Sequence, residues 1–261
     1  MENFNYLSVE KEGNLGIITI ANPPLNVLSK AVFHELEDAF KALENDEQTI
    51  AVLLTGEGNK AFVAGADIKE FPEMMGNVNM KSNVMEIHHI LNYIDAFAKP
   101  TIAVLNGMTF GGGCELALTC DLRVAEEHSM IGLPEITLGL FPGGGGTQRL
   151  PRLVGEARAK EIMFTGEPVT AAEAYRIGLV NATAKTGEGL AAAKTLASKM
   201  TRYSLQSLTR IKKAVDEGLN VSLQEGIAKE ADLFEEIFQT NDIKEGVQAF
   251  IEKRKPAFTH K

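Results

Sequence analysis

The chain has 261 residues, of which 44% are hydrophobic and 23% charged, as is ordinary for a globular protein of one large domain or of one domain with an appendage. Its formal net charge of −9 argues against a general binder of nucleic acid or of anionic membranes, because both partners are polyanions. The N-terminal segment lacks a secretory signal pattern and no apolar run reaches the roughly 18 residues of a membrane helix, so we expect a cytoplasmic protein.

The first part of the chain predicts strands alternating with helices. Residues 4–10 and 15–20 flank a Gly-Asn turn and predict a β-hairpin. Ser29 is typical of a helix N-cap, and apolar residues recur at helical spacing after it. Residues 49–55 predict a short apolar strand. Strand, helix and strand in this order indicate an α/β fold with crossover connections.

Residues 61–67, AFVAGAD, form the next unusual stretch. Gly65 permits an unusual backbone angle or a close approach, and Ala66 is too small to block a ligand. Asp67 is placed to cap a following helix. From these residues alone, a plain turn followed by an N-cap is the commoner explanation.

Residues 71–83 are rich in Met, Asn and Gly and show little periodicity. A mobile segment beside a site entrance and a loosely packed surface helix are both compatible with them. Residues 84–97 predict a helix that ends before Lys99-Pro100. His88 and His89 on it do not have the spacing of metal ligands on one helix face, so we expect no metal site.

The segment 106–135 is the centre of the protein in our interpretation. A strand at 101–105 leads into Gly111, Gly112 and Gly113, and a helix follows with Glu115 in its first turn. Unpaired amide N–H groups at such a turn suit a developing oxyanion. With Glu135 after the next turn, two carboxylates flank an anion hole, as acid–base chemistry requires. The alternatives are a first-turn carboxylate favoured by the helix dipole and a surface carboxylate after proline.

Two further features invite other interpretations. The four glycines 143–146 lack the GK[ST] sequence of a phosphate loop, so we expect a bend that brings backbone close to an acyl group or another helix. Cys114 and Cys120 lack any activating or metal-binding partner in the sequence, which favours buried inert thiols in a reducing compartment.

The last part of the chain predicts helices. Thr170 and Glu173 have the spacing of a capping box before a helix at 171–176. Beyond about residue 200 strand signals vanish, and an apolar stripe runs along 221–238. The group Lys253, Arg254 and Lys255 near the end is a solubilising charge run or part of a binding patch.

Three segments carry a family resemblance. NGMTFGGGCELALTCDLRVA at 106–125, GLPEITLGLFPGGGGTQRLPRLVG at 132–155 and AFVAGADIKEF at 61–71 resemble the crotonase superfamily, and within it the enoyl-CoA hydratases. The resemblance implies a spiral of ββα units in residues 1–200 that carries an acyl-CoA site. It also implies a helical trimerisation region in residues 201–261, within a trimer or a dimer of trimers. Coenzyme A would be part of the substrate, so no separate cofactor, nucleic acid or membrane partner is expected.

The resemblance also implies roles for single residues. The backbone N–H groups of Ala66 and Gly112 are expected to form the oxyanion hole, Glu115 to activate water, and Glu135 to protonate the second carbon. Apolar neighbours of Glu135 are expected to bury it and raise its pKa, namely Ile131, Leu133, Ile136 and Leu138. The substrate is expected to contact Ala64, Ala66, Asp67, Ile68, Gly112, Pro134 and Gly143.

The predicted reaction is the reversible hydration of trans-2-enoyl-CoA to 3-hydroxyacyl-CoA in fatty-acid β-oxidation. The alternatives are another acyl-CoA enzyme of the crotonase fold, such as an enoyl-CoA isomerase, or a non-catalytic protein that binds CoA or RNA. Relatives that isomerise double bonds commonly lack one of the two glutamates, so Glu115 and Glu135 together favour hydration.

Overall fold

The computed structural model, which describes residues 4–76 and 78–261, begins with the predicted hairpin. Strands β1 (Leu7–Glu12) and β2 (Leu15–Ile20) pair antiparallel. They open a six-stranded sheet of order β1-β2-β3-β5-β7-β10 that is parallel from β2 onward. Its other strands are β3 (Ala51–Gly56), β5 (Thr101–Leu105), β7 (Leu122–Glu126) and β10 (Ala182–Ala184).

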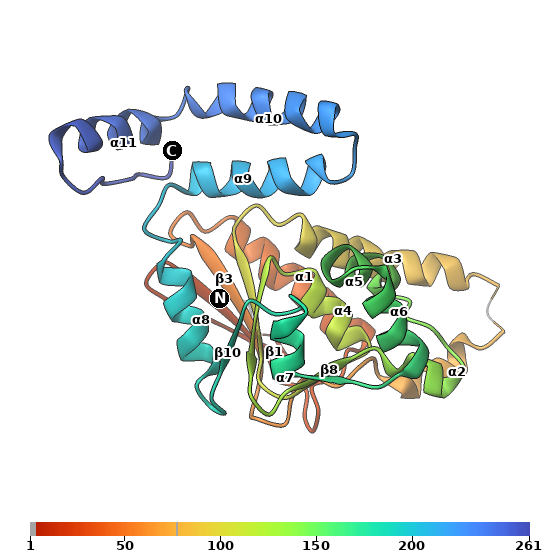
Figure 1. Cartoon of the computed structure of the whole chain (residues 1–261). Coiled ribbons are helices and arrows are strands. Elements are labelled where there is room, and N and C mark those ends of the chain that lie inside the picture. The colour runs from red at the N-terminus through yellow and green to blue at the C-terminus, as the bar shows by residue number, and fades with distance from the viewer. Residues whose placement is uncertain (1–3, 77) are drawn as a thin grey trace.

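A second sheet of four strands stands beside the first (Figure 1). It contains β4 (Ala61–Val63), β6 (Met108–Phe110), β8 (Met130–Gly132) and β9 (Val169–Thr170). The chain visits the sheets in turn: β3, β5 and β7 lie in the first, and β4, β6 and β8 follow them in the second. Helices succeed each such pair, so the predicted α/β spiral of ββα units is confirmed.

Helices cover both faces of the six-stranded sheet. Alternate strand residues such as Leu53 and Val104 pack with Ala193 of α8 (Gly189–Ser198) on one face. The opposite residues, such as Leu54, pack in the main core with helices α1 (Lys30–Glu44), α3 (Met80–Asp95) and α4 (Gly112–Leu118). Burial on both faces explains why the central strands β2, β3 and β5 are nearly continuous apolar runs. As predicted, Ser29 caps α1: its hydroxyl accepts the Val32 N–H at 3.3 Å.

The segment 71–83 is partly helical. The 3₁₀ turn η1 (Ile68–Glu70) precedes it, the short helix α2 (Phe71–Met74) forms its first four residues, and α3 already begins at Met80. The surface-helix interpretation therefore describes both ends of this segment. Asn77, near its middle, lies outside the described residues.

Four short elements connect β8 to β10 through β9. They are η2 (Pro134–Leu138), α5 (Gly146–Val154), α6 (Glu156–Thr165) and α7 (Ala171–Arg176). The predicted capping box before α7 is only half present. The Thr170 hydroxyl accepts the Glu173 N–H at 3.2 Å, but the Glu173 carboxylate binds both Nε and Nη2 of Arg176 at 2.7 Å. A bidentate charged pair competes successfully with one backbone N–H.

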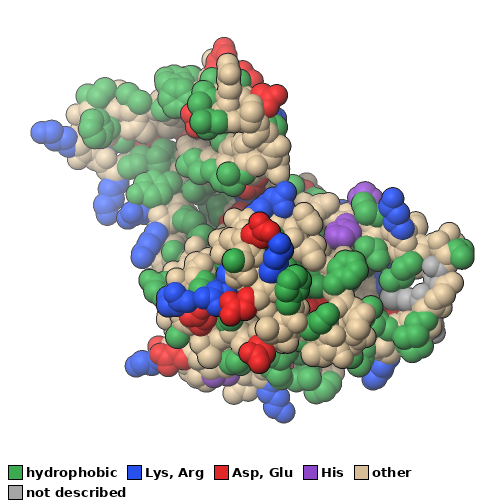
Figure 2. Space-filling view, turned by 45° about the vertical axis from the view of Figure 1, so that its right-hand side comes forward, with side chains coloured by type: hydrophobic (Ala, Val, Ile, Leu, Met, Phe, Trp, Pro, Cys, Tyr) green, Lys and Arg blue, Asp and Glu red, His purple; other side chains and the backbone are tan. Residues whose placement is uncertain are grey.

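Residues beyond 204 form α9 (Leu205–Gly218), α10 (Leu223–Ile237) and α11 (Asn241–Glu252), which extend away from the body (Figure 1). Lys212 of α9 joins this part to the body through an ion pair with Asp121 at 2.9 Å. Figure 2 shows hydrophobic side chains gathered on these helices. Large apolar side chains there are exposed, including Leu219, Leu223, Ile227, Phe234, Phe238 and Phe250. In the described part of the chain, no helix combines the length and apolar character needed to cross a membrane.

Candidate active site

Two free backbone amides, those of Ala66 and Gly112, lie close together between β4 and α4. Leu28 forms a parallel bridge beside Ala66, donating to Gly65 O and accepting the Asp67 N–H, both at 2.9 Å. The Ala66 N–H therefore points away from this bridge. Gly112 is the first residue of α4, and a Cβ placed on it would lie 3.6 Å from Ala66 N. Among the described residues, neither Ala66 nor Gly112 donates its N–H to a protein acceptor, so both amides are available to one anion.

Glu115 lies in the first turn of α4 and is only 4% exposed. Its Oε1 accepts the N–H of Gly144 at 2.7 Å and that of Gly146 at 2.8 Å. Burial raises the pKa of this carboxyl, whereas the two backbone hydrogen bonds and the charge of Arg149 lower it. The glycine run thus holds a buried carboxylate in one orientation, and the hydrogen bonds oppose the effect of burial.

Glu135 lies in the first turn of η2 and approaches the same turn from the other side. Its Oε1 would be 3.2 Å from a Cβ on Gly111, which has φ +52° and no side chain. Burial raises its pKa to about 7, and the charge of Glu115 adds to the effect. In the described structure, Glu135 Oε2 is buried and has no hydrogen-bond partner. A carboxyl that is half protonated near neutrality and has an unused oxygen suits proton transfer to a bound molecule.

The raised pKa of Glu135 predicts a stability penalty. Its pKa rises from 4.5 to about 7 on folding, so the folded state binds more protons between these values and stability falls as pH rises through them. We expect Glu135→Gln to raise Tm by several °C at pH 8 and to leave it unchanged below about pH 4.5. Thermal unfolding against pH measures this, with the exposed Glu167→Gln as control; a pH-independent shift would contradict it.

The other predicted contact residues lie around these groups. Ala64, Ala66 and Asp67 are half-buried on the segment after β4, and the Asp67 carboxylate caps η1 by accepting the Lys69 N–H. Ile68 is exposed. Pro134 precedes Glu135, and Gly143 precedes the glycine that binds Glu115; Gly143 is exposed, with open space where a Cβ would be.

The predicted apolar shell of Glu135 is only half correct. Ile131 and Leu133 are buried in the core, as expected. Ile136 and Leu138 are 45% and 60% exposed, because the chain forms a 3₁₀ helix after Pro134 and turns these two side chains outward. Glu135 is therefore buried by the core residues that precede it and by the Gly111 turn. The apolar side chains of its own 3₁₀ helix do not cover it.

The groups that hold Glu115 were not predicted from the sequence. Gly144 and Gly146 were expected only as part of a bend, yet their N–H groups bind the Glu115 carboxylate. A Cβ on Gly144 would lie 2.5 Å from Glu115 Oε2, so only glycine fits there. The run of four glycines indicated a special backbone, but nothing in the local sequence indicates that it binds Glu115, which lies about 30 residues earlier.

Three other predictions concern the cysteines, a metal site and the C-terminal charge run. Cys114 and Cys120 are free and buried, as expected, and burial raises the pKa of both thiols. Within the described residues, no group of three or more His, Cys, Asp or Glu is arranged to hold a metal ion. In the C-terminal charge run, Arg254 pairs with Glu245 and Glu252, which neutralise its charge locally.

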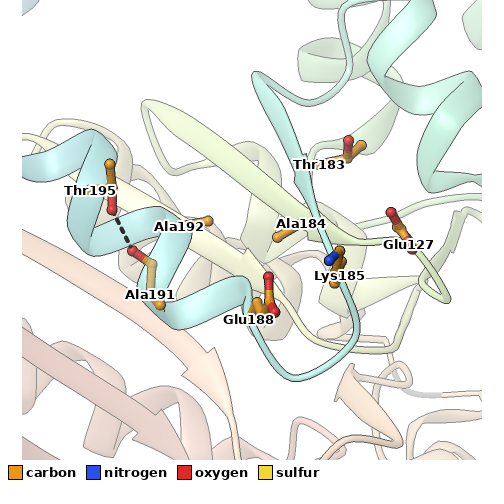
Figure 3. A pocket seen from close by; sticks show the side chains of 8 residues that line it. All are labelled: Glu127, Thr183, Ala184, Lys185, Glu188, Ala191, Ala192 and Thr195. Carbon is orange, nitrogen blue, oxygen red and sulfur yellow. Dashed lines mark hydrogen bonds between the residues drawn. The ribbon is translucent and has the colours of Figure 1, made fainter.

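A separate hollow of about 480 Å³ lies between β10 and α8 (Figure 3). Charged side chains of Glu127, Lys185 and Glu188 line it together with alanines and Thr195. Thr195 is already bonded to Ala191 O at 3.0 Å. None of the predicted site residues lines this hollow, so it is distinct from the paired carboxyls.

Comparison with known proteins matches the sequence to one family. A family model described as Enoyl-CoA hydratase/isomerase matches residues 10–261. The chain is 40% identical over 252 residues to a short-chain-enoyl-CoA hydratase of Clostridium acetobutylicum, covering 96% of each chain. It is 39% identical over 259 residues to a crotonyl-CoA hydratase of Syntrophomonas wolfei, covering 99% of each.

The fold gives the same result. The structure matches the crystal structure of an enoyl-CoA hydratase from Bacillus anthracis with a TM-score of 0.93, at 36% identity, covering 98% of this chain and 100% of that one. These matches confirm the resemblance predicted from the three sequence segments. The chain therefore belongs to the enoyl-CoA hydratase/isomerase family.

Proposed function

We propose that the protein is an enoyl-CoA hydratase that adds water reversibly to trans-2-enoyl-CoA, giving 3-hydroxyacyl-CoA in fatty-acid β-oxidation. The observation that carries the proposal is the convergence of Glu115 and Glu135 on a turn with two free amides, Ala66 and Gly112. Relatives named short-chain-enoyl-CoA hydratase and crotonyl-CoA hydratase support this substrate class. Coenzyme A enters as part of the substrate.

The mechanism follows from the positions of these groups. The ionised Glu115 takes a proton from water as the water oxygen attacks the third carbon of the acyl group. The electrons of the double bond move toward the thioester oxygen, whose growing negative charge is bound by the N–H groups of Ala66 and Gly112. One such donor contributes about 3 kcal/mol in a transition state. Glu135 then donates its proton to the second carbon, completing the addition.

The pair of carboxyls predicts a bell-shaped pH profile. In hydration, Glu135 carries a proton and Glu115 is ionised. In dehydration the two carboxyls again carry one proton between them, but that proton is on Glu115. The kcat/KM for hydration divided by the kcat/KM for dehydration equals the equilibrium constant of the reaction. That constant does not depend on pH, so kcat/KM must vary with pH in the same way in both directions. We expect kcat/KM to fall above pH 7 because the pKa of Glu135 is about 7.

The profile is measured with crotonyl-CoA in one direction and 3-hydroxybutyryl-CoA in the other. The Glu135→Gln variant serves as the control, since its residual activity should lose the basic limb. Profiles that differ between the two directions, or a basic limb that survives in this variant, would contradict the assignment of the limb to Glu135.

The proposal is tested by assaying the wild-type protein with crotonyl-CoA, with longer 2-enoyl-CoA thioesters and with a 3-enoyl-CoA. Hydration products from the 2-enoyl series support the proposal, and the chain-length profile gives the preferred acyl group. Double-bond migration without hydration would instead identify an isomerase. Salt-sensitive RNA binding without any turnover would identify the non-catalytic alternative.

The proposal includes a homotrimer or a dimer of trimers in the cytoplasm. Its support is the exposed apolar surface of α9, α10 and α11, which a single copy leaves uncovered (Figure 2). Sedimentation equilibrium measures the assembly, with Phe234→Asp as an interface variant. A wild-type monomer at micromolar concentration would rule this part out without affecting the proposed reaction.

A further inference from the structure

Arg149 lies against the glycine run that binds Glu115. Its side chain projects from α5 and is 16% exposed. The guanidinium donates from Nε to Asp95 Oδ2 at 2.9 Å and from Nη2 to Asn92 Oδ1 at 2.7 Å, both on α3. Its third nitrogen, Nη1, donates to Gly144 O at 3.3 Å. The side chain therefore links α3 to the loop that precedes α5.

The loop is shaped around this guanidinium. A Cβ on Gly145 would lie 2.3 Å from Arg149 Nη1, and Gly145 has φ +103°, so the position suits only glycine. Gly144 is held on both sides: Arg149 binds its carbonyl, and its N–H binds Glu115 Oε1 at 2.7 Å. A chain of contacts thus runs from Asp95 through Arg149 and Gly144 to the Glu115 carboxylate.

We propose that Arg149 is a positioning residue for hydration, which holds the glycine loop so that the Gly144 and Gly146 amides keep Glu115 aimed at the attacking water. The inference rests on the proposed function. Arg149 acts through the loop and does not touch the reacting atoms. Its positive charge adds a second effect, since it lowers the pKa of Glu115 against the effect of burial.

Other titratable groups surround Glu115. Glu135 faces it from η2, the Cys114 thiol lies next to it on α4, and His88 and Asp95 come from α3, with His88 Cε1 3.9 Å from a Cβ on Gly145. Arg149, by contrast, is the cation in the described structure whose charge acts on the pKa of Glu115 and lowers it. Removing that charge should raise the pH below which Glu115 becomes protonated and inactive.

The test compares Arg149→Met, Arg149→Lys and Asp95→Asn, with Arg152→Met as the matched control. Arg152 lies on the same helix, is exposed, and within the described residues directs its guanidinium hydrogen bonds to Gln148. For crotonyl-CoA, we expect Arg149→Met to lower kcat about 10–100-fold with KM within about 3-fold, and to move the acidic limb up by about 0.5–1 pH unit. Arg149→Lys should keep the limb and recover part of kcat.

Asp95→Asn keeps the guanidinium charge, so kcat should fall severalfold without an upward shift of the limb. An unchanged limb in Arg149→Met, or a raised KM with normal kcat, would overturn the inference. Infrared titration of Glu115, identified by difference from Glu115→Gln, gives a readout independent of turnover. If the wild-type protein were inactive but the midpoint of the Glu115 infrared titration rose in Arg149→Met, the proposed reaction would be overturned. The influence of Arg149 on Glu115 would still be supported.

Discussion

Glu115→Gln and Glu135→Gln should each lower kcat for crotonyl-CoA hydration by about 10²–10⁴-fold, the usual contribution of a general acid or base. Gln has nearly the same shape as Glu, so the fold should persist. In the Glu115 variant, the amide oxygen can still accept the N–H groups of Gly144 and Gly146, but the side chain cannot accept a proton from water. In the Glu135 variant, the proton for the second carbon is missing. Steady-state kinetics with circular dichroism measures both effects.

Glu126 provides a matched control for these two variants. Like Glu115 it is 4% exposed, and it accepts two N–H groups of a glycine-containing turn, from Gly187 at 2.8 Å and Gly189 at 3.0 Å. It lies on β7, beside α8, and plays no part in the proposed reaction. We expect Glu126→Gln to lower Tm while leaving kcat within about 2-fold. Near-normal turnover in either site variant would remove that residue from the mechanism.

Gly112→Ala should abolish most activity without unfolding the protein. A Cβ at this position would lie 3.6 Å from both Ala66 N and Leu28 Cδ1, which are ordinary van der Waals contacts. The new methyl group would therefore be tolerated by the fold but would occupy the space between the two free amides. We expect kcat/KM to fall about 10²–10³-fold, the cost of losing an oxyanion donor, with Tm unchanged or raised.

The neighbouring residue Gly113 provides a contrasting control, because a methyl group there should affect the fold and not only the activity. A Cβ on Gly113 would lie 2.2 Å from Val63 O, so Gly113→Ala should destabilise the fold itself. Gly218→Ala on α9, where the nearest atom is 3.9 Å away, should change neither activity nor stability much. If Gly112→Ala retained wild-type kcat/KM, the thioester oxygen would have to bind elsewhere.

Local sequence patterns predicted most of the elements because their causes are local. The Gly-Asn turn, the Ser29 cap and the helical spacing after it each depend on residues within a few positions, and β1, β2 and α1 formed as expected. Prediction failed where a second local arrangement competed with the expected one. Arg176 took the Glu173 carboxylate from the capping box before α7, and the 3₁₀ helix after Pro134 exposed Ile136 and Leu138.

By itself the sequence determined which residues are candidates for the chemistry: two glutamates, a small residue at 66 and glycines beside the second amide, in an order that identifies the family. Only the tertiary structure decided how these groups act. Hydrogen bonds from Gly144 and Gly146 orient Glu115, burial raises the pKa of Glu135 to about 7, and Arg149 joins α3 to the glycine loop. Each of these effects depends on distances and desolvation between segments far apart in the chain, which no local pattern encodes.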